Sequence, residues 1–142
     1  AATDLLTEAK LSPELRNEAL YYRAKAYTKQ KADKKAMEDY RELAKDTRNP
    51  YGAEAKYQVA QSLYDAKEYA AAEKELLNYI EQSTPHAYWL ARSFVLLSDV
   101  YHATGKDLDA RQYLLSLQQN YQGNDDIESM IESRLSKLKV EN

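Results

Sequence analysis

The chain contains no cysteine, and only three glycines and three prolines among its 142 residues. Without cysteine there is no disulfide bond and no zinc site built on thiolates. The shortage of glycine and proline disfavours an all-β fold, which needs a turn after each short strand. Alanine, leucine, lysine and glutamate are plentiful instead, and these residues favour α-helix. We therefore expect an all-α domain, long enough to bury a substantial core.

Motifs for catalysis, cofactors and metals are also missing. The sequence has no glycine-rich phosphate loop, no Ser-His-Asp spacing and no His-Glu metal motif. Its two histidines, His86 and His102, fall sixteen residues apart. That spacing is about 24 Å along one helix, too far for the two rings to share a metal. We therefore predict no enzyme activity, no cofactor and no metal.

Charge and hydropathy limit the partners. A net charge of −3 and an isoelectric point near 5.5 disfavour a general nucleic-acid partner. The charged run from Lys29 to Lys35 is interpreted as a solvated turn. No stretch approaches the ~18 apolar residues of a membrane span, so no membrane insertion is expected.

Every proline follows a residue that caps helices well. Ser12-Pro13, Asn49-Pro50 and Thr84-Pro85 recur 37 and 35 residues apart. A Ser, Asn or Thr side chain accepts a hydrogen bond from an amide of the first turn. Proline suits the first helical position because its missing N–H has no partner there. Each dipeptide therefore predicts a helix start, and their spacing predicts a repeat architecture.

Small and large residues recur at the same interval. Aligning Ala36, Ala72 and Ala110 gives three blocks of 34 residues, 17–50, 53–86 and 91–124. Upstream of each alanine lies a second small residue. A large residue follows the upstream small residue by three positions, and large residues follow the aligned alanine by four and seven positions. Residues at these spacings share one helix face. The small upstream residues are Ala24, Ala60 and Ser98. Each block therefore predicts a helix, a short turn and a second helix.

The predicted turns lie at residues 31–33, 67–68 and 105–107. Only the third contains a glycine, Gly105, at a helix end where a positive φ is favoured. Lys31 and Lys67 take the equivalent places in the first two blocks. We therefore expect a strained or frayed last helical turn at both lysines.

The aligned blocks resemble the tetratricopeptide repeat, a 34-residue helix-turn-helix unit. The third block carries most of the family's large, small and turn positions: Phe94, Leu97, Ser98, Tyr101, Gly105, Ala110 and Leu114. The other two match at Leu20, Ala24, Tyr27, Ala36 and Tyr40, and at Val59, Ala60, Tyr69, Ala72 and Leu76. The resemblance covers residues 17–124. It implies a right-handed α-α superhelix, a solenoid of about three repeats.

The blocks also depart from the family pattern. Arg23 and Lys56 stand where a large apolar residue is usual, and block starts are 36 and 38 residues apart. The extra residues 87–90 are expected to extend a helix over about 86–104. Long, irregular repeats of this kind resemble those of large bacterial cell-envelope proteins. That resemblance points to the bacterial envelope or periplasm, although the sequence itself decides no compartment.

The two ends differ in character. Residues 1–16 carry a short apolar stripe and are interpreted as the remnant second helix of a truncated preceding repeat, in a longer protein. Residues 125–142 are predicted to form a capping helix, begun by Asn124-Asp125-Asp126. Its apolar face would consist of Ile127, Met130, Ile131, Leu135 and Leu138. A solenoid needs such a polar-backed terminal helix for solubility.

The resemblance also nominates a binding surface. In the family, certain positions of each first helix face a concave groove, and these positions hold Tyr21, Lys25, Tyr57, Gln61, Tyr64, Asp99 and His102. Exposed aromatic surface usually marks an interaction site. The alternative is that these tyrosines pack between helices with the hydroxyl at the rim. Trp89 likewise has two interpretations, a partner anchor or, as we prefer, a plug between repeats.

We therefore predict a non-enzymatic scaffold that binds a protein or peptide partner through its concave face. It would form part of a larger multi-repeat protein. The alternative is a structural spacer or an oligomerisation segment, self-associating with no peptide in the groove.

Overall fold

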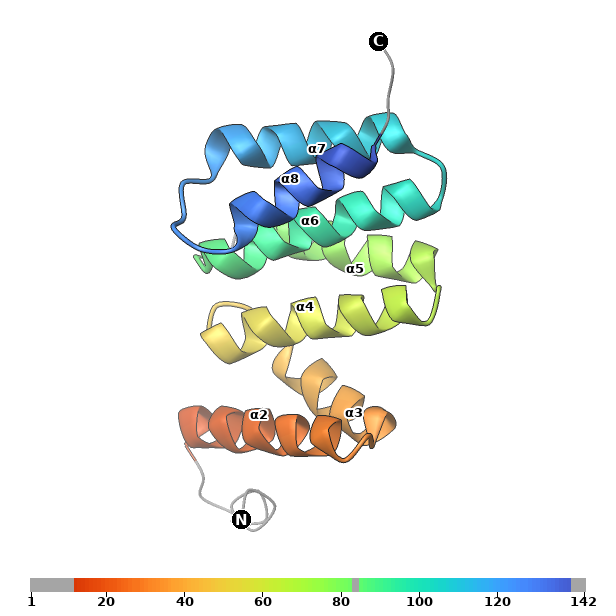
Figure 1. Ribbon diagram of the computed structural model, residues 1–142. Coiled ribbons are helices and arrows are strands. Elements are labelled where there is room, and N and C mark those ends of the chain that lie inside the picture. The colour runs from red at the N-terminus through yellow and green to blue at the C-terminus, as the bar shows by residue number, and fades with distance from the viewer. Residues whose placement is uncertain (1–11, 83–84, 139–142) are drawn as a thin grey trace. The chain divides into compact units, whose positions relative to one another are not determined.

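The computed structural model describes residues 12–82 and 85–138, and all regular structure in these ranges is helical. Seven helices follow one another there: α2 (Pro13–Lys29), α3 (Asp33–Leu43), α4 (Pro50–Asp65), α5 (Tyr69–Glu81), α6 (Ala87–Ala103), α7 (Asp107–Asn120) and α8 (Ile127–Lys137) (Figure 1). Helices close in sequence pack as antiparallel pairs, most extensively α2 on α3 and α6 on α7. The all-α prediction is confirmed for this part of the chain.

The chain divides into two compact units, and their boundary falls inside α4. The first unit is Ala1–Val59, with α2, α3 and the beginning of α4. The second is Ala60–Asn142, with the rest of α4 and all later helices. Most of the predicted remnant helix over 1–16 lies outside the described residues, and the last four residues of that segment already belong to α2.

Two of the three predicted helix starts are confirmed. The Ser12 hydroxyl accepts a hydrogen bond from the Leu15 amide at 3.2 Å, and α2 begins at Pro13. The Asn49 side chain accepts from the Gly52 amide at 2.8 Å, and α4 begins at Pro50. The third prediction is wrong in detail, because α6 begins at Ala87, two residues after Pro85. Its cap residue, His86, makes no side-chain capping bond.

One turn geometry recurs at the ends of α2, α4 and α6. Lys31, Lys67 and Gly105 have φ values of 60°, 62° and 79°, in the left-handed region. The amide of the next residue then bonds a carbonyl five residues back, as Ala32 does to Tyr27 at 2.8 Å. Glu68 bonds Leu63 at 2.8 Å, and Lys106 bonds Tyr101 at 2.7 Å. The expected strain at the two lysines is confirmed, and these hydrogen bonds keep the helix ends from fraying.

The aligned small residues form the helix contacts. Ala24, Ala60 and Ser98 are 0%, 0% and 1% exposed, and Ala36, Ala72 and Ala110 are 4%, 0% and 0% exposed. Large buried side chains lie a turn or two from them, among them Leu43, Leu76, Tyr79 and Leu114. Small residues let two helix backbones approach, and the large ones fill the space between turns.

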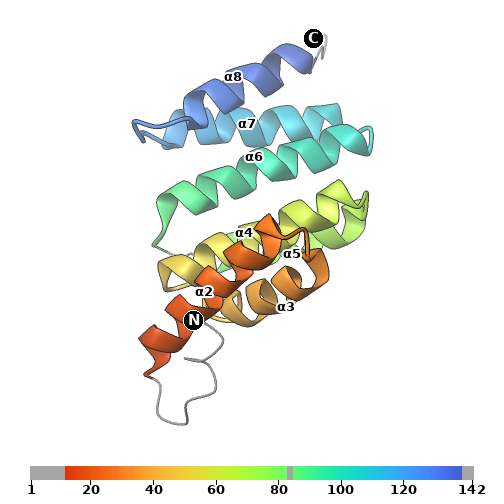
Figure 2. The ribbon, with the colours of Figure 1, turned by 60° about the horizontal axis from the view of Figure 1, so that its bottom comes forward.

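Helix α8 covers one side of the α6–α7 pair. It packs against both helices and buries Ile127 and Ile131. Figure 1 shows α8 across α6 and α7, and Figure 2 shows it along α7. The carboxylate of Asp125 accepts a hydrogen bond from the Ile127 amide at 3.0 Å and so caps its first turn. Glu128 and Glu132 on the outer face are exposed. The predicted apolar face is confirmed at Ile127 and Ile131, whereas Arg134, predicted for the charged outer face, instead bonds Asp99 of α6.

Candidate functional site

Two of the predicted groove residues meet in the first unit, around a carboxylate that the sequence did not single out. Glu54, near the start of α4, accepts hydrogen bonds from the Tyr21 hydroxyl at 3.0 Å and from Lys25 Nζ at 2.7 Å. Tyr21 and Lys25 are one turn apart on α2, so both reach the same side chain. The ring of Tyr51 packs on Tyr21, with centroids 4.7 Å apart. In the first unit, the predicted binding residues Tyr21 and Lys25 are therefore hydrogen-bonded within the chain, to Glu54.

The electrostatics of this cluster favour its present protonation state. Burial and the hydrogen bond to Glu54 raise the pKa of Tyr21. Partial burial by itself lowers the pKa of Lys25, but the hydrogen bond and charge of Glu54 outweigh it, and the net pKa is raised. Lys25 is therefore a cation already paired inside the chain, and a partner's acidic group would have to compete with Glu54.

Tyr57 departs most from the prediction. Its side chain is only 6% exposed, so almost none of its surface can touch a partner. Its position on α4, between Ala53 and Ala60, places it on the face that packs. We therefore correct its role to packing, which is the alternative that the sequence left open for the tyrosines.

The other predicted residues of α4 make local contacts. Gln61 donates a side-chain hydrogen bond to Asp65 at 2.9 Å. Tyr64 packs edge-on against Tyr69 across the α4–α5 turn, with centroids 5.5 Å apart. Burial, followed by the charge of Asp99, raises the pKa of Tyr64. The charge of Asp99 therefore acts on the Tyr64 hydroxyl within the second unit.

Asp99 and His102, on α6, are both engaged. Asp99 accepts two hydrogen bonds from the Arg134 guanidinium of α8, at 3.2 and 3.3 Å. His102 Nδ1 lies 2.9 Å from Asp107 Oδ1 across the α6–α7 turn. Arg134 also lines a small recess with Ser98, His102 and Lys137. Helix α8 therefore reaches the predicted surface and neutralises its carboxylate.

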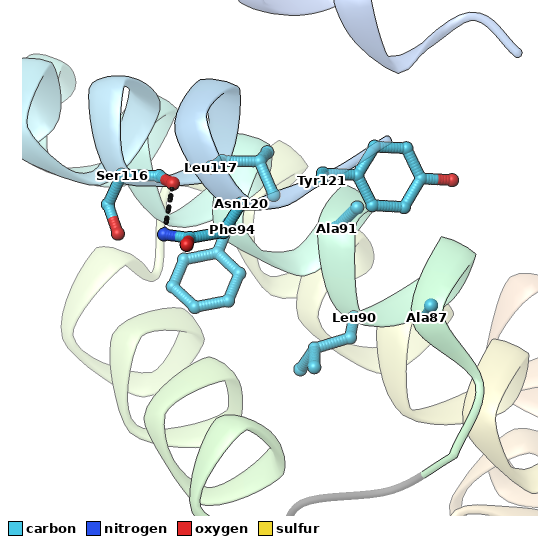
Figure 3. A pocket seen from close by; sticks show the side chains of 8 residues that line it. All are labelled: Ala87, Leu90, Ala91, Phe94, Ser116, Leu117, Asn120 and Tyr121. Carbon is cyan, nitrogen blue, oxygen red and sulfur yellow. Dashed lines mark hydrogen bonds between the residues drawn. The ribbon is translucent and has the colours of Figure 1, made fainter. Parts of the chain in front are cut away.

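An apolar pocket of the second unit lies elsewhere, between α6 and α7. It encloses about 240 Å³. Four residues of α6 and three of α7, followed by Tyr121, line it: Ala87, Leu90, Ala91, Phe94, Ser116, Leu117, Asn120 and Tyr121 (Figure 3). No charged side chain is among them. The Asn120 amide at its edge donates to the Ser116 carbonyl at 2.8 Å.

The Tyr121 ring forms one wall of this pocket, and several contacts fix that ring. Its hydroxyl donates to Asp125, and burial followed by this hydrogen bond raises the pKa of Tyr121 to about 12. Tyr88 donates to the neighbouring Asp126 at 2.9 Å. A Cβ placed on Gly123 would lie 2.2 Å from the Tyr121 hydroxyl. Only glycine at position 123 leaves the ring where it is.

Sequence reasoning missed this pocket. The spacing of Ala87, Leu90, Ala91 and Phe94 marks an apolar face of α6, but of these residues only Phe94 was singled out, as a position of the repeat. Phe94 and Leu90 are indeed only partly buried. The available signal was an apolar stripe that begins in residues 87–90, which lie between the second and third aligned blocks.

Across residues 12–82 and 85–138, no three His, Cys, Asp or Glu side chains are grouped to hold a metal ion. Within the same ranges, none of the helices combines the length and the apolar character that crossing a membrane requires.

Comparison with protein-family models and with curated proteins gives no match from which a family could be assigned. The sequence matches no protein-family model and, at a significant level, no curated protein.

Proposed function

We propose that the chain is a non-enzymatic scaffold of about three tetratricopeptide-like repeats, wound as a right-handed superhelix. It binds a segment of a protein partner through its concave face. The observation that carries the proposal is the recurrence of one helix pair. Equivalent small residues are buried in all three blocks, and the same left-handed turn closes each first helix. Stacked equivalent units offer an extended surface.

The contacts within the chain decide which groups a partner can use. Lys25 and Asp99 are each held by an opposite charge, Glu54 and Arg134. Partly exposed pairs of this kind are worth about 0–1 kcal/mol, so a partner gains little by replacing them. The proposed binding therefore depends on shape and on neutral groups such as Tyr64.

Site-specific photo-crosslinking tests the scaffold role. A photoreactive amino acid replaces Lys25 or His102 on the proposed face, and Lys45 or Asn78 at exposed control positions. We expect one and the same partner to be crosslinked from Lys25 and from His102, and not from the controls. The purified partner should then bind the unmodified chain in calorimetry. Equal crosslinking from all four positions, or no calorimetric binding, would contradict the proposal.

A second role, oligomerisation, is favoured by one exposed surface. Leu15 and Tyr22 are 42% and 56% exposed and lie two turns apart on one face of α2. Residues spaced by seven share a helix face within about 20°. Sedimentation over a concentration series separates the roles. A monomer throughout favours the scaffold, whereas an oligomer that Leu15→Ser and Tyr22→Ser dissociate favours self-association.

A further inference from the structure

Three tyrosine rings of the first unit form one aromatic surface, which we call the tyrosine cluster. Tyr21 and Tyr22 come from α2, and Tyr51 comes from the start of α4. The ring centroids of Tyr21 and Tyr22 are 5.4 Å apart, and those of Tyr21 and Tyr51 are 4.7 Å apart. The cluster shares Tyr21 with the proposed binding face, and its Tyr22 is 56% exposed. Exposed aromatic surface of this kind marks an interaction site.

The middle ring of the cluster is fixed by contacts within the chain. The Tyr21 hydroxyl donates to Glu54, and Lys25 Nζ lies 5.0 Å from the centroid of the Tyr21 ring. Lys25 itself is paired with Glu54 at 2.7 Å. The surface is therefore in place before a partner arrives, so little free energy is lost to its ordering.

The two outer rings have hydroxyl groups that a partner can use. Neither the Tyr22 nor the Tyr51 hydroxyl forms a hydrogen bond with another of residues 12–82 or 85–138. Desolvation, followed by the charge of Glu18, raises the pKa of Tyr51, so this hydroxyl keeps its proton and can donate. A partner that fits the cluster therefore offers apolar surface to the rings and hydrogen-bond acceptors beside it.

The polyproline II conformation of a partner segment meets both requirements. The carbonyls of an α-helix are already bonded within the helix, apart from those of its last turn. Polyproline II has no internal hydrogen bonds, so its carbonyls stay available. Its proline rings are apolar, and such segments dock on surfaces lined by aromatic side chains. The two centroid distances limit the cluster to a length of about 10 Å, close to one polyproline II turn of about 9 Å.

An acidic side chain borders the cluster. Glu18 precedes Tyr21 and Tyr22 by one helical turn, at spacings of three and four, and so shares their side of α2. Glu18 is exposed, and it forms no ion pair with any side chain of residues 12–82 and 85–138. Lys25, on the next turn, is already paired with Glu54. The unpaired charge beside the rings is therefore negative and favours a cationic residue in the partner.

We propose that the tyrosine cluster binds a proline-rich segment in the polyproline II conformation, with an arginine or lysine beside the prolines. The inference rests on the proposed scaffold function and names the chemistry of the partner segment. The proline rings pack on the rings of Tyr22 and Tyr51, and the tyrosine hydroxyls donate to carbonyls of the segment. The cationic residue pairs with Glu18. Such a segment is largely ordered before it binds, which lowers the entropic cost.

The first test titrates the full chain with the synthetic peptide acetyl-Pro-Pro-Pro-Pro-Pro-Pro-Arg amide and follows the tyrosine ring signals by NMR. Two comparison peptides have the same length. In one, glycine and serine replace the prolines, and in the other, glutamate replaces the arginine. We expect saturable shifts at Tyr22 and Tyr51 with the arginine peptide. The glycine–serine peptide should bind at least about tenfold more weakly, because it has no rings and a larger ordering cost. Equal binding of these two peptides would overturn the proposal.

Exposed residues provide matched variants. Tyr22→Ala removes the exposed ring and should weaken the arginine peptide about tenfold, a typical loss for a tyrosine anchor. Leu108→Ala truncates a side chain of α7 that is 67% exposed, and it should leave binding unchanged. Glu18→Gln should weaken the arginine peptide by up to about fivefold and abolish its advantage over the glutamate peptide. Unchanged binding in Tyr22→Ala would overturn the assignment.

A second copy of the chain is the competing occupant of the cluster. Dilution of the chain without peptide tests for it, with the ring signals of Tyr22 and Tyr51 as the readout. We expect these signals to stay unchanged over the concentration series. Shifts that follow the protein concentration, and that the arginine peptide does not reverse, would show self-association through the cluster and overturn the proposal.

The partner found by crosslinking separates failure of this inference from failure of the scaffold role. Tyr22→Ala should weaken that partner's binding about tenfold, and Leu108→Ala should not. If the partner binds Tyr22→Ala and the unmodified chain equally, the cluster is not its contact, although the scaffold role stands. If the arginine peptide binds but no partner is crosslinked, the scaffold role fails, whereas the assignment of the cluster to proline-rich segments holds.

Discussion

At the scale of single residues, the two lysines in left-handed turns carry a measurable strain. An L-residue in this region is disfavoured by about 1–2 kcal/mol, whereas glycine adopts it freely. Lys31→Gly and Lys67→Gly should therefore each raise the free energy of unfolding by up to about 1 kcal/mol, after glycine's greater entropy in the unfolded chain is deducted. Urea denaturation measures the change.

The matched control for this prediction is Lys34→Gly. Lys34 is exposed in the first part of α3, where glycine should destabilise by about 1 kcal/mol. Gly105→Ala should also destabilise by about 1 kcal/mol. Its Cβ would meet no atom within 4 Å, so only the backbone conformation opposes the change. Destabilisation by all four substitutions would mean that the positive φ values at the lysines are not strained.

Arg23 shows how a charged residue fits a position where the repeat usually has an apolar one. Its guanidinium donates to both oxygens of Asp39, at 2.8 and 2.6 Å, and the Asp39 side chain is nearly buried. Removing one partner of a buried pair is costly because the other charge is left uncompensated. Asp39→Ala should lower the free energy of unfolding by about 3 kcal/mol.

The double change Arg23→Leu with Asp39→Ala provides the comparison. Replacing a whole buried pair by apolar groups is often neutral or stabilising. The double variant should therefore be more stable than Asp39→Ala alone in the same urea titration. Additive losses from the two single changes would show that the pair is not coupled.

At the scale of helices, the small residues fix how closely two helices approach. Ala72 on α5 is 0% exposed, whereas its neighbour Ala70 is exposed on the same helix. Ala72→Leu should overpack the helix contact and destabilise by about 1–3 kcal/mol, and Ala70→Leu should be nearly neutral. Thermal melts of the two variants compare them directly. Identical melting points would mean that the alignment of the blocks is wrong.

Helix α8 makes a second prediction at this scale. Deleting residues 125–142 removes the buried side chains of Ile127 and Ile131 and the carboxylate of Asp125 that holds Tyr121. Each fully buried aliphatic side chain is worth about 1.5–3 kcal/mol. The truncated chain should therefore melt at a lower temperature and self-associate in sedimentation. A monomer with an unchanged melting temperature would show that α8 does not cap the α6–α7 pair.

The helices themselves were largely predictable from local patterns. Ser12-Pro13 and Asn49-Pro50 mark helix starts because the side chain and the proline both act within one turn. The start of α6 was misplaced by the same reasoning. Its first turn has no side-chain cap, and the helix begins at Ala87, where the apolar face begins.

At the scale of the whole molecule, the surroundings of the candidate site residues were less predictable, because their contacts join distant segments. A helix face can be assigned from spacing, but the partners of its side chains come from other helices. Glu54 holds both Tyr21 and Lys25, and Arg134 holds Asp99. The pocket was missed for the same reason, since it is a space between α6 and α7. No periodicity in the sequence reports such a space.

The tyrosines couple the stability of the whole molecule to alkaline pH. Burial is the main cause of raised pKa values at five tyrosines. It raises the pKa of Tyr121 to about 12. It also raises the pKa above the ordinary value of 10.0 at Tyr21, Tyr64, Tyr88 and Tyr101. In the unfolded chain these hydroxyls lose their protons near pH 10. Between pH 10 and pH 12 the unfolded state therefore binds fewer protons than the folded state, so the free energy of unfolding falls as pH rises.

This stabilisation is complete below pH 10 and should be lost progressively between pH 10 and pH 12. Urea titrations across that range measure the loss, and phenolate absorbance shows which tyrosines have ionised. Tyr121→Phe removes one of the shifted groups, so its stability should fall less steeply with pH than that of the unmodified chain. Equal slopes for the two proteins would mean that folding does not raise the pKa of Tyr121.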